Sequence, residues 1–354
     1  MLVCFCPLSS AQTDAALWRF VHPNAKALIG IDVQRILKSR VASEMSSQLH
    51  AMPLPLELPL AFSSMDLIHS IDRIVVSSPG RASGNTKAEP PLLIAVSGRF
   101  EPVKLGRMFV KSGAKPQAFK SVTIYRPQDK ANSDFGFVIL NSQVLLIGDV
   151  SSLCDAIDRL EKGTDAPARI VERARDMDIA YDFWAILLGP PSAVASERFP
   201  MADLAGKLKG FEAGIAVRDG VAMDVNLNTT SESAAKEMAA QFSKMIHLVG
   251  KDHQNHPQFA GIDRRLKMTV ERSDLKFALR LDDKEVARMA KAFDVARSRR
   301  DALTAKARDV SPSVTPLPVT PPPAQKQVIR IQGLDDGPRE IPYGATPAPP
   351  PYRP

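Results

Sequence analysis

The order of its apolar segments is the feature that most constrains the fold of this chain of 354 residues. Strands and helices of similar length follow one another in the same order twice, which predicts one unit at 13–165 and a second at 166–296. In the first unit, strands are expected at Ala27–Val33, Ile71–Ser77, Leu92–Val96, Val122–Arg126, Phe135–Leu140 and Val144–Ile147, and helices at Gln34–Leu49, Pro102–Ser112 and Val150–Glu161. In the second unit, we expect the strand Phe183–Leu188, the hairpins Phe211–Leu227 and Leu266–Leu281, and helices near Met201–Leu208 and at Ser231–Val249 and Lys284–Phe293.

The predicted strands alternate apolar and polar residues, as in Met223–Leu227, so each sheet is expected to bury one face and to wet the other. Each predicted helix carries one apolar stripe that can cover the buried face. The sequence therefore predicts an α+β fold, in which two tandem pseudo-repeats of antiparallel sheet have helices packed on one face.

Several turn and cap signals support these boundaries. The dipeptide Asp219-Gly220 between alternating segments predicts a two-residue hairpin with a type I′ turn. Thr229 and Glu232 have the spacing of a capping box, and Asp149 is placed to cap the helix that follows it. Near the end of the body, Asp282 or Asp283 is expected to start the last helix.

The last segment, 297–354, has a different composition. Thirteen of the 29 prolines lie in 310–354, which predicts an extended, disordered tail without a packed core. The tail contains one strand-like island at 328–334, whose docking residues are predicted as Val328, Ile329, Arg330, Ile331 and Leu334. Such an island can add a strand to a partner's sheet, or it can pair with an edge of the protein's own sheet; the sequence leaves both readings open.

The net charge of +7 is concentrated toward the end of the chain. Residues 295–354 hold nine Lys/Arg and five Asp/Glu, a net of +4, and a basic run spans Arg297–Arg308. This run is typical of a solvated helix end, and binding to an anionic surface or to nucleic acid is the alternative. No aromatic residue is interleaved with it, so specific binding of single-stranded nucleic acid is not expected.

The first residues indicate export. Residues 1–12 resemble the apolar core and small-residue end of a truncated signal peptide, which favours a periplasmic or secreted location. No apolar run is long enough to span a bilayer. Trp18 and Phe20 follow the expected cleavage site and are predicted to fasten the N-terminal segment to the body. Cys154 is expected to be a small buried hydrophobic residue rather than a nucleophile.

No motif in the sequence assigns catalysis. A phosphate-binding loop, a dinucleotide fingerprint, a nucleophile elbow and the paired-histidine zinc motifs are all missing. His247, His253 and His256, beside Asp252, are the weak candidates for a metal site, and with them a metal-dependent hydrolase is the alternative function. Otherwise we expect no enzyme activity and no cofactor.

The segments Asn24–Val33, Leu92–Gly113, Ser121–Arg126 and Phe135–Leu160 resemble uncharacterised bacterial secreted or envelope proteins with a duplicated α+β unit and a proline-rich tail. The resemblance implies no known activity and no functional residue. The leader-like first residues, the duplicated unit, the missing catalytic motifs and the proline-rich end favour a non-enzymatic, exported envelope protein that acts as a scaffold for an unknown protein or envelope polymer, with the tail as its docking element. The sequence does not indicate an oligomeric state.

Overall fold

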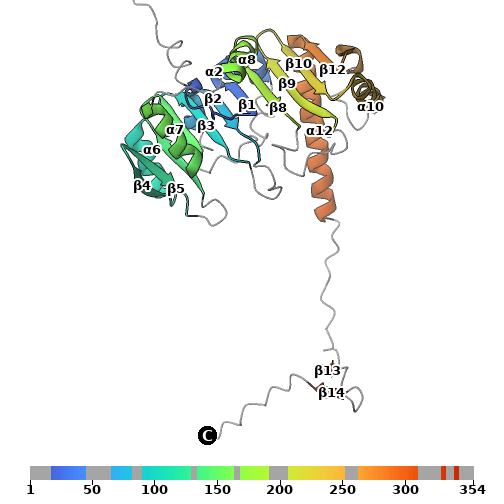
Figure 1. Cartoon of the computed structure of the whole chain (residues 1–354). Coiled ribbons are helices and arrows are strands. Elements are labelled where there is room, and N and C mark those ends of the chain that lie inside the picture. The colour runs from blue at the N-terminus through green and yellow to red at the C-terminus, as the bar shows by residue number, and fades with distance from the viewer. Residues whose placement is uncertain are drawn as a thin grey trace, which may run out of the picture. The chain divides into compact units, whose positions relative to one another are not determined.

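A single antiparallel sheet organises the first of two units in this computed structural model, Met1–Arg300 (Figure 1); the second unit is Asp301–Pro354. The structure describes residues 17–44, 65–81, 90–128, 134–162, 168–190, 206–251, 262–309, 328–331 and 339–342. The described strands of the first unit are β1 (Ala27–Asp32), β2 (Ile71–Ser78), β3 (Leu93–Gly98), β4 (Lys115–Phe119), β5 (Val122–Arg126), β6 (Phe135–Ile139), β7 (Val144–Asp149), β8 (Phe183–Leu188), β9 (Leu208–Ala216), β10 (Val221–Thr229), β11 (Leu266–Glu271) and β12 (Asp274–Leu281). The described helices are α2 (Val33–Lys38), α3 (Arg40–Glu44), α5 (Met65–Ser70), α6 (Pro102–Lys111), α7 (Val150–Lys162), α8 (Ala168–Ala180), α10 (Glu232–Lys251), α11 (Ile262–Arg265) and α12 (Asp283–Asp309).

The twelve described strands are ordered β11-β12-β10-β9-β8-β1-β2-β3-β7-β6-β5-β4. Every neighbouring pair is antiparallel, so the α+β class and the antiparallel pairing predicted from the sequence are confirmed. The predicted first and second units contribute one half of the sheet each, and β1 and β8 meet at the centre, with Ala27 opposite Leu187.

In the first half, helices cover both faces of the sheet. Alternate residues of β3 belong to two separate cores: Leu93 and Ala95 pack with α7 and α8, while Ile94 and Val96 pack with α6. The prediction that helices pack on one face only is therefore wrong for this half. The continuous apolar sequence of β3 and β7 is the signal of strands buried on two faces.

The second half follows the predicted pattern more closely. Its outer strands β10, β12 and β11 bury one face beneath α10, where Leu275 and Phe277 of β12 meet Met238, whereas α8 covers the opposite face of β8. The ladder register shows that the face beneath α10 is the face that α6 covers in the first half, because side-by-side residues run across five strands as Val225, Ala213, Ala185, Ile29 and Val76. On the opposite face, β11 and β12 present polar and charged side chains.

The N-terminal segment is fastened to the body by aromatic residues, as predicted. Trp18 and Phe20 are buried, and the ring of Trp18 stacks on that of Trp184 with centroids 6.1 Å apart. Trp184 lies in the central strand β8 and is fully buried. These contacts place the first described residues in the core shared by α7 and α8.

The helix boundaries are fixed by local hydrogen bonds. The Asp32 carboxylate accepts from the Arg35 N–H at the start of α2. At the start of α12, Asp282 and Glu285 form a reciprocal capping box, which confirms the predicted start of the last helix. The cap of α10 differs from the prediction: Ser231 Oγ, rather than Thr229, accepts from a backbone N–H in the first turn, and Thr229 Oγ1 donates to backbone carbonyls instead.

The predicted two-residue turn at Asp219-Gly220 is wrong. Ala216 pairs with Ala222, and four residues, 217–220, separate the two strands. Gly220 has a φ of 86°, but Asp219 is not among the described residues with positive φ, which a type I′ turn would require of both. Two-residue connections occur instead after Phe119 and after Glu271, where Lys120 and Arg272 take the positive φ.

Other differences from the prediction concern single elements. The helix expected at Gln34–Leu49 is interrupted at Ser39, which separates α2 from α3, and its residues 45–49 lie outside the described part of the chain. Strand β4 and helix α8 were not predicted. Of the short helix expected near Met201–Leu208, residues 201–205 lie outside the described part, and Leu208 begins β9.

Within the second unit, two short strands pair with each other. Strand β13 (Val328–Ile331) is antiparallel to β14 (Arg339–Pro342), with Ile329 opposite Ile341. The expected strand at the start of the island 328–334 is thus present, and its partner is another segment of the tail. Helix α12 is longer than predicted and includes the basic run Arg297–Arg308.

Candidate binding site

An open groove lies at one end of the sheet, between α6 and the hairpin β4–β5. Its volume is about 550 Å³, within the range of about 300–1,000 Å³ that is typical of ligand sites. It is lined by Pro102, Val103, Gly106, Arg107, Val110, Lys111, Pro116, Thr123 and Tyr125. The groove lies where α6 crosses β4 and β5 at the edge of the sheet.

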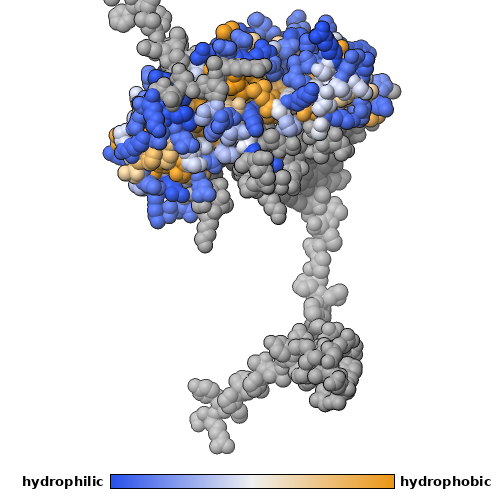
Figure 2. All heavy atoms as spheres, in the orientation of Figure 1, coloured by the Kyte–Doolittle hydropathy of each residue, from blue (hydrophilic) through white to orange (hydrophobic). Residues whose placement is uncertain are grey.

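Helix α6 presents apolar residues on two sides. Leu105 and Phe109 point into the core, where they pack against β6 and β7. Val103 and Val110, one helical face away, are 67% and 49% exposed and line the groove instead. Exposed apolar side chains on a helix can form part of a contact surface, and α8 and α10 carry others, among them Ile179 and Leu248. Figure 2 shows this apolar area in the region of α6 and β5, bordered by hydrophilic residues.

The floor of the groove is formed by Tyr125 and Gly106. The Tyr125 ring leans on Phe109 with centroids 5.4 Å apart, which fixes its position. A Cβ at position 106 would lie 2.6 Å from Tyr125 Oη, so the glycine allows the ring to approach the helix closely. Pro116 and Thr123 lie on the same sheet face as Tyr125, because Pro116 is opposite Tyr125 in the ladder. The Tyr125 ring is therefore closely packed against α6, and this packing defines the floor of the groove.

The groove is also the most basic part of the body. Residues 101–128 hold six Lys/Arg and one Asp/Glu, a net of +5 out of the chain's +7. Lys120 is bound to Asp158 and Glu161 of α7, at 2.5 and 2.8 Å. Within the described part of the chain, by contrast, no ion pair involves Arg107 or Lys111, which both line the groove. These two cations are free to meet an acidic ligand.

The lining residues suit binding rather than covalent chemistry. They offer apolar side chains, hydroxyl groups and cations, but no carboxylate, thiol or imidazole. Over the described residues, no group of three His, Cys, Asp or Glu side chains is close enough to hold a metal ion. The lining residues include no histidine, cysteine, aspartate or glutamate, the side chains that most often act in general acid–base catalysis.

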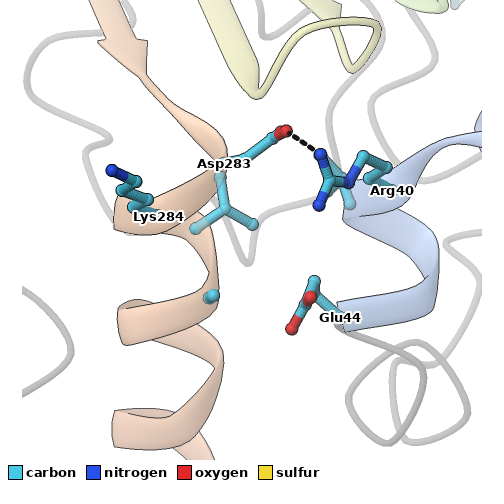
Figure 3. A pocket seen from close by; sticks show the side chains of 7 residues that line it. Arg40, Glu44, Asp283 and Lys284 are labelled. Carbon is cyan, nitrogen blue, oxygen red and sulfur yellow. Dashed lines mark ion pairs between the residues drawn. The ribbon is translucent and has the colours of Figure 1, made fainter.

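A smaller pocket lies between α3 and α12, where the two halves of the sheet meet (Figure 3). Its volume is about 150 Å³, and Arg40 and Asp283 point toward each other across it in an ion pair of 3.1 Å. Glu44 and Lys284 add one further charge of each sign. Because its charges balance and its two central groups already bind each other, this pocket has less to offer a ligand than the groove.

A network of charges around the buried carboxylates of Asp32 and Asp182 lies at the ends of the central strands. The Asp182 carboxylate, 1% exposed, accepts from the Val217 N–H and pairs with Arg35 and Arg218 at 3.3 and 3.5 Å. The Arg73 guanidinium bridges two further carboxylates, Asp32 and Asp178, which belong to β1 and α8. Three arginines balance three aspartates, so the network is neutral and ties both halves together.

Of the candidate metal ligands, only His247 lies in the described part of the chain. His247 is exposed on α10, while His253 and His256 lie outside the described residues. Cys154 is half-buried beside the core, where burial raises the pKa of its thiol, as expected of an unreactive cysteine.

The predicted docking residues are found only in part. Val328, Ile329, Arg330 and Ile331 form β13, and Leu334 lies outside the described part of the chain. Sequence reasoning missed the groove, although the density of Lys and Arg in 101–128 was a signal available in the sequence.

Comparison with known proteins does not identify a family. No family model matches the chain, and no curated protein matches it. Among solved structures, the chain is similar to one titled "Structure of crystal form I of TP0453", with 12% sequence identity and a TM-score of 0.42 over 78% of this chain and 97% of that chain. We base no argument on a similarity of this level. None of the described helices is both long and apolar enough to cross a membrane.

Proposed function

We propose that this chain is a non-enzymatic protein of the bacterial envelope, exported to the periplasm or beyond, which binds a protein or polymer partner. In this proposal the α6–β4–β5 groove is the main binding surface of the body, and the tail 297–354 is a second docking element. The sequence of residues 1–12 supports export.

One observation carries the proposal. In the groove, the exposed apolar side chains Val103 and Val110 lie beside Arg107 and Lys111, two cations without an ion pair among the described residues. Exposed apolar residues with unpaired charges at their border are typical of a surface that another molecule covers.

We further propose that the body arose from a duplicated α+β unit. In both halves three strands run outward from the centre, β1-β2-β3 and β8-β9-β10, and in both a helix, α6 or α10, follows the third of them. The next strand outward is then β7 or β12, each of which leads into a further helix. On this interpretation, the hairpin β4–β5 is an addition to the first copy, and the groove came with it.

Affinity capture from the native host tests the binding function. The intact chain is compared with a chain lacking 310–354 and with the groove variant Val103→Asp/Val110→Asp. Ile179→Asp is the matched control, because Ile179 is an exposed apolar residue of α8 outside the groove. We expect a reproducible partner that is lost with the groove variant and retained with the control. Loss on tail deletion alone would assign binding to the tail, and no dependence on either region would contradict the proposal.

Export has its own test. We expect Edman sequencing of protein from a fractionated native host to find a processed N-terminus near residue 13 in the periplasmic or secreted fraction. An intact Met1 on cytosolic protein would refute this part of the proposal and leave the groove unaffected.

A further inference from the structure

We infer that the partner of the α6–β4–β5 groove is a short acidic, amphipathic helix of another protein. This inference rests on the proposed binding function and adds the chemistry of the partner to it. Three features support it: the shape of the groove, the residues of the edge strand, and the charge of the lining residues.

The lining residues of α6 lie on one helical stripe. Val103, Gly106, Arg107 and Val110 are separated by three or four residues, so they form a continuous ridge along the helix. With Tyr125 in the floor, this ridge makes the helix side of the groove. A bilayer surface is flat and is met by protruding apolar residues, whereas a concave apolar groove suits the ridge of an amphipathic helix.

Strand addition is the other way in which a peptide can bind at the end of a sheet. The terminal strand β4 begins with Lys115 and Pro116, and both residue types protect edge strands from pairing. Proline also removes one backbone donor from the strand. The features of β4 therefore disfavour an added strand and leave the groove itself as the place of contact.

Charge selects an acidic partner. Arg107 and Lys111 both line the groove, are exposed and lie one helical turn apart. A partner helix with Glu or Asp on its flank can pair with both of them while its apolar stripe contacts Val103 and Val110. The ten residues of α6 span about 15 Å at 1.5 Å per residue, so the expected contact involves about three turns of the partner helix.

Fluorescence anisotropy with the full chain tests the inference. The probe is a fluorescein-labelled helical peptide of about four turns, with leucines at i, i+3, i+4 and i+7 and glutamates on both flanks. The comparison peptides carry lysine at each glutamate position, or the same composition in scrambled order. We expect saturable binding of the acidic helix alone, weakened by added salt because the cations lie at the solvent border.

Two variants locate the binding. Val103→Asp/Val110→Asp should abolish it, and Arg107→Glu/Lys111→Glu should weaken it by about tenfold or more. Arg175→Glu/Lys244→Glu makes the same change in net charge at exposed positions outside the groove and should leave binding unchanged. Thermal unfolding checks that each variant folds, and Val103→Ser/Val110→Ser replaces the aspartate variant if that variant does not.

Equal affinity for the scrambled peptide, or equal weakening by the control variant, would overturn the inference, because either result means nonspecific charge attraction. Groove-dependent binding to phosphatidylglycerol vesicles with no binding of the helix would also overturn it, in favour of a membrane surface. If the groove variants lose the native partner in affinity capture while no acidic helix binds, the proposed function stands and this inference fails. If capture is also unaffected by the groove variants, both fail.

Discussion

Each end of the sheet carries a helix on the same face, but the two helices cover the last strands to different extents. At one end, the 20 residues of α10 lie over β10, β12 and β11, and the apolar residues of these strands join one core with the helix. At the other end, the ten residues of α6 contact β6 and the hairpin β4–β5 that follows the helix, and the groove lies between the helix and this hairpin. The hairpin provides the strand side of the groove, and its Ile124 and Tyr125 also pack into the cores of the first half.

The two halves also differ in how deeply they bury their strands. Strand β7 is apolar on both sides and contacts α7 on one face and the α6 core on the other. Strand β12 alternates, with Leu275 and Phe277 inside and Lys276 outside. The first half is therefore expected to be the more rigid support, and it is the half that carries the groove.

The largest effect is expected from a matched pair of core truncations, Leu146→Ala and Leu275→Ala. Both side chains are 0% exposed. Leu146 belongs to the large core that the first half forms with α7 and α8, whereas Leu275 belongs to a smaller cluster near the edge strand β11. Because the cost of a cavity depends on how far its surroundings can collapse, we expect about 4 kcal/mol at Leu146 and about 2.5 kcal/mol at Leu275. Urea unfolding measures both; equal values would contradict the proposed difference between the halves.

The next largest effect concerns the charge network between the halves. Asp182→Ala removes the partner of Arg35 and Arg218 and leaves the Val217 N–H without its acceptor, so we expect a loss of about 3 kcal/mol. Asp182→Asn keeps a hydrogen-bond acceptor and should cost about half as much.

Asp224→Ala is the comparison on β10, where Asp224 also accepts from the Tyr181 hydroxyl at 3.1 Å. Asp224 is one-third exposed and binds Arg280 through two hydrogen bonds of 2.8 and 2.9 Å, so its loss should cost only about 1 kcal/mol. Denaturant unfolding of the three variants would contradict the central role of the network if Asp224→Ala were the most harmful.

The sequence predicted the elements whose pattern is local. The bounds of Val122–Arg126, Phe183–Leu188 and the outer limits of Leu266–Leu281 agree with the structure, because strand alternation and flanking turn residues mark them. Strand β4 was missed because Lys115, Pro116 and Gln117 have low strand propensity, and only its pairing with β5 makes it a strand. The single shared sheet could not be predicted, since the meeting of β1 and β8 is a long-range contact.

The same limit applies to the site. The density of basic residues in 101–128 could have indicated a charged surface, but not a groove. The groove depends on the approach of Tyr125 to Gly106, two residues that no local pattern connects. The candidate histidines, in contrast, were adjacent in sequence, and His247 proves to be exposed on a helix.

A smaller effect is expected at the floor of the groove. Alanine in place of Gly106 should gain about 1 kcal/mol in helix propensity, but its Cβ would lie 2.6 Å from Tyr125 Oη. We therefore expect Gly106→Ala alone to be neutral or destabilising by up to about 1 kcal/mol, since the ring is held by Phe109. In the background of Tyr125→Phe, which lacks that oxygen, the same change should stabilise the protein. A double-mutant cycle by denaturant unfolding measures the coupling; strict additivity would mean that the ring moves freely and that the floor is not rigid.

The smallest expected effect is a dependence of the free energy of unfolding on pH, which His22 in the first half should cause. Burial, together with the nearby charge of Arg159, lowers the pKa of His22, whose Nδ1 accepts from the Asn24 N–H. A lowered pKa means that the unfolded chain binds more protons, so the contribution of His22 is full above the ordinary histidine pKa of about 6.5 and decreases as the pH falls below it. His22→Gln should therefore lose less stability than the wild type between pH 7.5 and 5.5, while His247→Gln, at an exposed position of the other half, should follow the wild type. Urea unfolding at the two pH values measures these losses of stability. Identical losses in all three proteins would contradict the expected contribution of His22 in the N-terminal segment.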